Sequence, residues 1–395
     1  MKWRIVAFMI ILTVSGNTCS LEKKKNGFLA CIDIRKNYTE KEIIITDFAD
    51  VTYIHLSTDC DDYLYKGRIE NVTNNTLVVY DNSSFSILFF TKDGTPKSRF
   101  NRCGQGPEEY FGATRILYDE ELDDVFVCND IINYIQVYSS TGEYKRKITL
   151  PEYAKVSSLV SFDNQSFFVF SEDFHDFLNI RYYKHDFPYT TYYRISKTNG
   201  EILDSLKLAC NEIRLDIETK DKEGKTAFWR LLYYRLVKGT DGFFLCNPET
   251  DTVFLYKRDK SLTPVFYKIP SLRNQVPKVI IPNIVDASRY QFFEVATLVN
   301  DDYNNQKRFH FRDKETGEIF RQKIISPDYI GKEFFICASG LRCGLGEKNG
   351  YVFELGLFEL KQAYNENRLD GKLKELVATL DEYKDNNVFM FVEFK

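Results

Sequence analysis

One short run of the sequence brings together residue types that do chemistry. It holds two glycines, a proline, two adjacent carboxylates and a tyrosine: Gly104, Gly106, Pro107, Glu108, Glu109 and Tyr110. The glycines and the proline predict a tight crossing in which the backbone passes too close to a neighbour for a Cβ atom. The two glutamates then lie on one face of the molecule. They form either a ligand or cation site, or the charged rim of a structural corner. No Lys-Ser/Thr pair follows, so this is not a phosphate-binding loop.

Residues that ligate metals or act as nucleophiles are few and scattered. His175 and His185 share a polar segment with three carboxylates, but their spacing matches no standard set of metal ligands. We therefore expect a solvated loop there, and we expect His310 to be a half-buried residue of a strand. The chain has no Cys-x-x-Cys pair and no Gly-x-Ser-x-Gly elbow. The sequence predicts no catalytic residue, no metal site and no cofactor, with a divalent cation at the two glutamates as the one exception left open.

The cysteines divide into one near the N-terminus and eight that are spread along the chain. An even number permits disulfides in an oxidising compartment. Cys128 and Cys246 each end an apolar run, which favours small buried side chains. The strings around Cys103 and Cys343, Arg-Cys-Gly-x-Gly, are near duplicates. They indicate either a disulfide between two loops or, as we expect, the same glycine turn used twice.

The first nineteen residues have the layout of a bacterial lipoprotein signal peptide. Lys2 and Arg4 precede the apolar run Ile5–Val14, and Cys19 follows small and polar residues. Ten residues make a helix of about 15 Å, half of a ~30 Å bilayer core, so the run is too short to span a membrane permanently. We predict that Cys19 is the site of lipid attachment; ordinary secretion and an uncleaved anchor remain the alternatives. Residues 20–44 are predicted to be a polar tether.

The composition predicts a β-rich body with a substantial core. Hydrophobic residues make up 44% of the 395, with 33 Phe and 26 Tyr, and such residues favour strands. The formal net charge is −4, from 53 basic and 57 acidic residues. A nucleic-acid-binding surface is clearly basic, so we expect no nucleic-acid partner.

An internal repeat with a period of about 48 residues indicates how this body is organised. Similar apolar strands end in Asp or Asn at three places: Leu77–Asp81, Val125–Asn129 and Phe243–Asn247. A second strand and a glycine turn follow, and two looser copies share the glycine turn: the glycines are Gly94, Gly142, Gly200 and Gly317. With a last partial unit at 333–355, this makes six units. Units of this length are typical of propeller blades with four antiparallel strands.

A ring of blades requires that the two ends of the chain meet. Val51–Leu56 and Asn387–Val392 both look like strands, and we place both in the last blade so that no sheet edge stays open. Between them, Leu373, Leu376, Val377 and Leu380 have the spacing of one helical face. The predicted fold is therefore all-β: residues 45–395 form a six-bladed β-propeller of four-stranded antiparallel blades, with one short C-terminal helix.

The run from Gly104 to Tyr110 resembles a family signature, G-x-G-P-x-E-Y/F. The signature belongs to six-bladed β-propeller lipoproteins of Gram-negative bacteria, which are related to NHL-repeat and TolB-like propellers. Asp385–Phe389 is similar to that group's closing strand, although Asn387-Val388 stands where Asn-Pro is usual. The resemblance covers about 45–395 and implies the fold more than the function.

Three functions remain compatible with the sequence. The favoured one is a lipid-anchored binding or scaffold module of the cell envelope, with an envelope protein or a glycan as its ligand. Tyr182, Tyr183, Tyr189, Tyr192 and Tyr193 are candidates for stacking on sugars. The alternatives are a structural assembly partner and a cation-dependent enzyme, lactonase- or lyase-like, that uses the central channel. Leu21–Lys25 is basic, which favours the periplasmic side over the cell surface.

Overall fold

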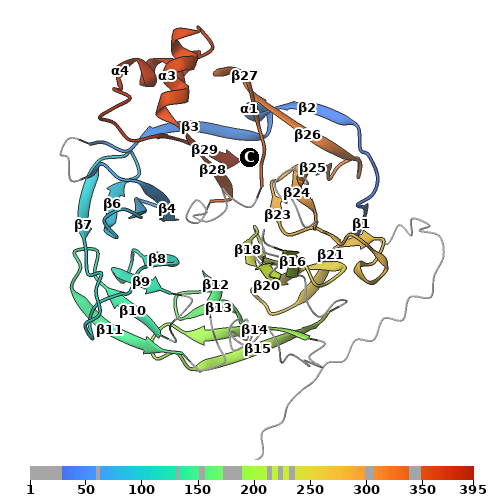
Figure 1. Cartoon of the computed structure of the whole chain (residues 1–395), viewed down its shortest axis with the longest axis horizontal. Helices are drawn as coiled ribbons and strands as arrows, with labels where there is room; N and C mark the ends of the chain where they lie inside the picture. Colours follow the sequence, from blue (N-terminus) through green and yellow to red (C-terminus); the bar gives the residue numbers. More distant parts are fainter. Residues whose placement is uncertain are drawn as a thin grey trace, which may run out of the picture.

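The structure is a computed structural model that describes residues 29–58, 63–129, 132, 134–150, 156–171, 189–210, 216–220, 226–230, 236–298, 307–337 and 348–395. Six sheets of three or more strands stand around a common axis, and the chain visits them in order (Figure 1). The predicted β-propeller is thereby confirmed. The ring arrangement has a physical cause, because the two faces of each radial sheet are apolar and are buried only when blades stand next to each other.

The first three blades each have four antiparallel strands. Blade 1 consists of β4 (Gly67–Val72), β5 (Thr76–Asp81), β6 (Ile87–Thr91) and β7 (Pro96–Phe100). Blade 2 consists of β8 (Arg115–Asp119), β9 (Asp124–Cys128), β10 (Tyr134–Tyr138) and β11 (Tyr144–Thr149). Blade 3 consists of β12 (Val156–Ser161), β13 (Ser166–Ser171), β14 (Tyr189–Ser196) and β15 (Ile202–Ala209). In each blade the first strand lies nearest the axis (Figure 1).

Blades 4 and 5 are larger, because the N-terminal part of the chain adds a strand to each and blade 5 has six strands of its own. Blade 4 consists of β18 (Leu236–Lys238), β19 (Gly242–Leu245), β20 (Thr252–Lys257) and β21 (Leu262–Ile269). Blade 5 consists of β22 (Val279–Ile280), β23 (Ile284–Asp286), β24 (Tyr290–Thr297), β25 (Lys307–Asp313), β26 (Ile319–Ser326) and β27 (Tyr329–Phe334). The short helix η2 (Leu272–Asn274) lies between the two blades in sequence, and a hairpin of β16 (Asp216–Lys220) and β17 (Thr226–Arg230) precedes blade 4.

The prediction that residues 20–44 form a tether is wrong for residues 30–44, which the structure describes. β1 (Ala30–Asp33) pairs in parallel with β21 at the outer edge of blade 4, and β2 (Glu40–Ile44) pairs in parallel with β26 of blade 5. Ile32 and Ile34 are 0% and 2% exposed and belong to the core between these blades. Residues 30–44 therefore form a strap across two blades, because their short apolar runs cover two sheet edges that would otherwise stay unpaired.

The predicted closure of the ring is confirmed. In blade 6, β29 (Val388–Phe394) lies between β28 (Gly350–Leu355) and β3 (Ala49–His55), and both pairings are antiparallel. The last blade thus contains strands from both ends of the chain, as Figure 1 shows. The predicted last unit was too wide, however, because β27, which includes Glu333, pairs with β26 of blade 5.

The C-terminal region contains two helices where the sequence predicted one. α3 (Leu357–Asn365) and α4 (Gly371–Thr379) pack beside blade 6, and the short α1 (Ile45–Phe48) precedes β3. Leu373 and Val377 of the predicted helix are buried in α4. None of the described helices is long and apolar enough to cross a membrane.

The glycine turns of the repeat have the predicted conformation. Gly94, Gly142, Gly200 and Gly317 all have a positive φ, between 76° and 93°. In blade 4 the equivalent position is Lys260, which adopts a φ of 68° without being glycine. The repeat is therefore real in space even where its sequence has drifted.

Candidate functional site

A cavity of about 350 Å³ lies where four blades meet near the axis. It is lined by residues of the first strands of blades 1 to 4 (β4, β8, β12 and β18), by the turns after the first three of these strands, and by Lys197 and Arg258, which follow the third strands of blades 3 and 4. We call it the four-blade cavity. A volume of this size is at the lower end of those that hold small ligands in proteins.

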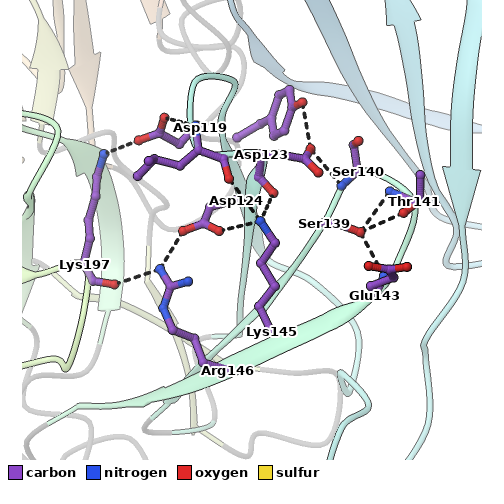
Figure 2. A network of polar contacts seen from close by, with 12 residues as sticks. Asp119, Asp123, Asp124, Ser139, Ser140, Thr141, Glu143, Lys145, Arg146 and Lys197 are labelled. Carbon is purple, nitrogen blue, oxygen red and sulfur yellow. Dashed lines mark hydrogen bonds and ion pairs between the residues drawn. The ribbon is translucent and has the colours of Figure 1, made fainter.

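A buried ion pair forms one part of the cavity wall. Lys197, which follows β14 of blade 3, donates from Nζ to the Asp119 carboxylate at the end of β8 in blade 2, at 3.1 Å (Figure 2). The Lys197 side chain is only 6% exposed and lies over the rings of Phe126 and Phe167. The pair therefore holds two adjacent blades at a fixed distance along the cavity.

A second carboxylate supports this ion pair from behind. Asp124 accepts hydrogen bonds from Arg146 Nη2 at 2.6 Å and from Lys145 Nζ at 3.0 Å, and Arg146 also donates to the carbonyl oxygen of Lys197 (Figure 2). Burial raises the pKa of Asp124, but the hydrogen bonds and charges of the two cations outweigh it and leave this pKa below its usual value. The carboxylate stays ionised near neutral pH and keeps both cations in place.

The same turn of blade 2 is also fixed by a tyrosine. Tyr118 donates from its hydroxyl to Asp123 Oδ1 at 3.1 Å, and the backbone N–H of Ser140 donates to the same oxygen at 3.0 Å. Burial, followed by the nearby Asp123 charge, raises the pKa of Tyr118 to about 12. The phenol is therefore a neutral donor at physiological pH.

Glu120 connects blade 2 to blade 1 on the other side. Its carboxylate accepts hydrogen bonds from the Thr73 hydroxyl at 2.9 Å and from the Thr76 hydroxyl at 2.5 Å, and the Asn75 amide group also donates to it. Burial raises the pKa of Glu120, yet the donated hydrogen bonds lower it further, so its pKa lies below the usual value. Three consecutive blades are thus tied together by ionised carboxylates around the cavity.

The run from Gly104 to Tyr110 lies at the opposite end of β8 from Asp119 and makes the contacts of a structural corner. The Tyr138 hydroxyl donates to the carbonyl oxygen of Glu108 at 2.9 Å, and Gln136 Nε2 donates to the carbonyl oxygens of Pro107 and Glu109. Both donors belong to β10, the third strand of blade 2 from the axis. These contacts join blades 1 and 2, which is one of the two predicted roles; a ligand at the exposed Glu108 stays a prediction.

Close packing inside this corner explains its glycines. The Glu109 carboxylate turns back and accepts a hydrogen bond from the Gly106 N–H at 2.8 Å, so it does not share the exposed face with Glu108. A Cβ atom on Gly104 would lie 1.9 Å from a Glu109 carboxylate oxygen. Tyr110 is buried and donates from its hydroxyl to the carbonyl oxygen of Phe85 at 2.5 Å. The predicted close approach is confirmed, and the neighbour is a side chain of the same run.

Other residues singled out from the sequence have structural roles or lie outside the described residues. His310 is buried rather than half-buried, stacks on Phe293, and has a pKa lowered to about 4 chiefly by burial. Cys128 and Cys246 are buried as predicted, and Tyr192 is fully buried against Phe168. Six of the residues singled out from the sequence lie outside the described residues. They are Cys19, which falls within 1–28, and Tyr182, Tyr183, His175, His185 and Cys343.

The described residues contain no group of three or more His, Cys, Asp or Glu side chains that could hold a metal ion. Sequence reasoning did not find the four-blade cavity, because its wall residues come from four repeats and have nothing in common locally. The only signal was that the turns after the first strands of blades 1, 2 and 3 are rich in Asp, Glu and Asn.

Comparison with known families agrees with the fold. Residues 21–217 match the model of a family described as a 6-bladed beta-propeller. No curated protein matches the sequence. Together with the ring of sheets, the family match places the chain among the β-propeller proteins.

The solved structures that resemble the chain are similar to it in fold but have low sequence identity. A protein of Bacteroides fragilis, described as a "putative exported protein", superposes with a TM-score of 0.58 at 15% identity, covering 93% of this chain and all of the other. A member of the DUF4221 family from Bacteroides vulgatus gives a TM-score of 0.43 at 13% identity, covering 88% of this chain and 97% of the other. Identities this low leave function to be argued from the site.

Proposed function

We propose that the protein is an exported, membrane-attached β-propeller that binds its ligand in the four-blade cavity. The observation that carries this proposal is the construction of the cavity. Four blades contribute to its wall, and ionised side chains connect the neighbouring blades 1, 2 and 3 around it. A concave site held rigidly by polar bridges loses little entropy when a ligand enters. The ligand class is a glycan or a segment of an envelope protein.

Export and attachment are proposed from the N-terminal sequence. Residues 1–19 have the composition of a lipoprotein signal peptide, and a protein of similar fold is described as a putative exported one. Several acyl chains on Cys19 would hold the propeller at a membrane by burying hydrocarbon. The basic residues at 23–25 favour the periplasmic side of that membrane.

Fatty-acid labelling tests the attachment. Cells that express the full chain and are fed a clickable fatty acid should yield a labelled protein, because the Cys19 thiol carries the acyl group. The Cys19→Ala variant should lose the label, while a Cys31→Ala variant, changed at the next cysteine along the chain, should keep it. A Cys19→Ala protein that is labelled as strongly as the wild type would show that the anchor is elsewhere.

Blocking the cavity tests the binding role. Ser161 is an exposed residue of β12 in the cavity wall, and Ser161→Trp should fill much of the volume. We expect native mass spectrometry of the full chain, purified from its own envelope, to show a ligand adduct on the wild type that the variant lacks. The matched control is Ser205→Trp on β15, the outer strand of the same blade, which is exposed and should keep the adduct. Equal ligand content in the two variants would exclude the cavity as the binding site.

A further inference from the structure

We propose that the protein has a second binding site, for an uncharged oligosaccharide, on two exposed phenylalanines beside the Gly104–Tyr110 corner. The site consists of the exposed residues of the turn 82–85 in blade 1 and of the segment 101–111, and we call it the Phe85–Phe111 surface. None of its residues lines the four-blade cavity. The inference therefore goes beyond the proposed function and does not rest on it.

Phe85 has a backbone conformation that phenylalanine rarely adopts. Its φ is +61°, in the left-handed region where a Cβ atom crowds the backbone and where glycine or asparagine is usual. The side chain is 45% exposed and packs in none of the core clusters of the described residues, so the core gains little from it. Strain of this kind persists only where the surrounding structure holds it, and it is found mainly at functional positions.

Hydrogen bonds on both sides hold Phe85 in this conformation. Its N–H donates to the carbonyl oxygen of Asp81 at 2.8 Å, and the Asp81 carboxylate accepts from the Ser84 hydroxyl at 2.6 Å. From the other side, the Tyr110 hydroxyl donates to the carbonyl oxygen of Phe85 at 2.5 Å. The ring is thus presented on a rigid turn, and little entropy is lost when a ligand binds to it.

A second exposed phenylalanine is fixed beside the first by the same tyrosine. Phe111 follows Tyr110 directly, is 53% exposed, and its carbonyl oxygen accepts from Asn129 Nδ2 at 2.5 Å. Neither Phe85 nor Phe111 contacts another aromatic ring among the described residues. Single exposed apolar residues are ordinary on a protein surface, but two rigidly held rings at one end of a blade form a surface that a ligand can cover.

The groups around the two rings favour an uncharged ligand. The exposed charged residues of the surface are Arg102 and Glu108, one of each sign, and Arg102 Nε already donates to a backbone carbonyl of blade 2. Gln105 is exposed, and its amide group has no partner among the described residues. It follows Gly104, whose N–H donates to the carbonyl oxygen of Tyr110 at 3.0 Å, so it lies beside Phe111. This amide can both donate and accept a hydrogen bond.

An uncharged oligosaccharide matches both kinds of group. A pyranose has an apolar face of C–H groups, which stacks on an aromatic ring, and a rim of hydroxyls, which donate to and accept from an amide. Two separate rings suit two units of one sugar chain. A proline-rich peptide is the competing ligand, because it also packs on aromatic side chains. Such peptides dock in grooves lined by aromatic residues, whereas these two rings stand on exposed turns.

Titrations of the full-length protein with defined ligands, followed by ligand-observed NMR, test the inference. The uncharged sugars are cellotetraose, chitotetraose and maltotetraose; tetragalacturonate is the charged sugar, and octaproline is the competing peptide. We expect at least one uncharged sugar to bind about tenfold or more tightly than tetragalacturonate and octaproline. The uncharged sugar that binds identifies the class of glycan.

Substitutions of the two rings locate the site. The double variant Phe85→Asn/Phe111→Asn should lose about tenfold or more of the sugar affinity, because both stacking contacts are removed. Asparagine tolerates the left-handed conformation, so the melting temperature should stay within about 3 °C of the wild type. Phe85→Tyr/Phe111→Tyr keeps both rings and should keep the affinity. The matched control is Phe358→Asn, at a 68% exposed phenylalanine of α3, which should also bind normally.

Each result supports or overturns the inference. It is overturned if no uncharged sugar binds, if octaproline or tetragalacturonate is preferred, or if the double asparagine variant binds the sugar like the wild type. A large fall in the melting temperature of that variant would show that the rings are structural, and would overturn it as well. If Ser161→Trp loses the sugar while the asparagine variant keeps it, the sugar binds in the four-blade cavity; the inference then fails and the proposed function stands.

Discussion

The Ile32→Ala variant is expected to lose about 2–5 kcal/mol of unfolding free energy, as large-to-small substitutions in a core do. Ile32 is 0% exposed and packs in the cluster that includes Phe266 of blade 4 and Phe293 of blade 5. Removing its side chain leaves a cavity at the seam between these blades. It also loosens β1 on the edge of β21, because only four residues of each strand are paired there.

Denaturant unfolding followed by hydrogen exchange measures this effect. The matched control is Leu29→Ala, three residues earlier, where the side chain is 51% exposed and the expected change is below about 0.5 kcal/mol. Faster exchange in β21 should accompany the loss in Ile32→Ala. Equal stability of the two variants would mean that residues 30–34 are a tether, as their sequence suggested, and not part of the core.

Deleting the last strand is expected to have the largest effect of all, because it opens the ring. A stop after Asn387 removes β29, which is the middle strand of blade 6 and pairs with both β28 and β3. The side chains lost from the core are Val388, Phe389, Met390, Phe391 and Val392. At about 1.5–3 kcal/mol each, their burial is comparable with the whole stability of a typical protein.

We therefore expect the truncated chain to aggregate or to show no cooperative unfolding in circular dichroism and size-exclusion chromatography. Met390→Asp, which keeps the chain length, should be strongly destabilised for the same reason, since it places a charge at a site that is 0% exposed. Phe358 of α3 is 68% exposed, so Phe358→Asp is the control and should fold normally. A truncated protein that folds and unfolds like the full chain would refute closure through β29.

The repeat and the closure could be predicted because both depend on local patterns. A glycine at the same position in four units indicates a positive φ there. Two strand-like segments lie at opposite ends of the chain and belong to no repeat unit, which indicates that they share one blade. The strap could not be predicted in this way. Its two apolar runs, around Ile32 and Ile43, are short and interrupted by the charged residues at 35–42, so they look like a linker. These runs form strands only because they pair with the neighbouring sheet edges.

The second helix and the cavity were missed for related reasons. In α3 only Leu357, Leu360 and Ala363 are buried, and Phe358 points to solvent, so its apolar face is too weak to stand out. The cavity wall includes Asp119, Lys197 and Arg258, which are far apart in sequence and line one cavity only after three blades have packed side by side. The most distinctive motif, Gly104–Tyr110, proved to be a corner whose conformation is set by internal hydrogen bonds.

An X-ray structure of the protein with the ligand it carries from its own envelope would test the central claim most directly. The account predicts ligand density in the four-blade cavity, among β4, β8, β12 and β18. Ligand density at the Gly104–Tyr110 corner, at the opposite end of β8, with the four-blade cavity filled only by solvent, would contradict it.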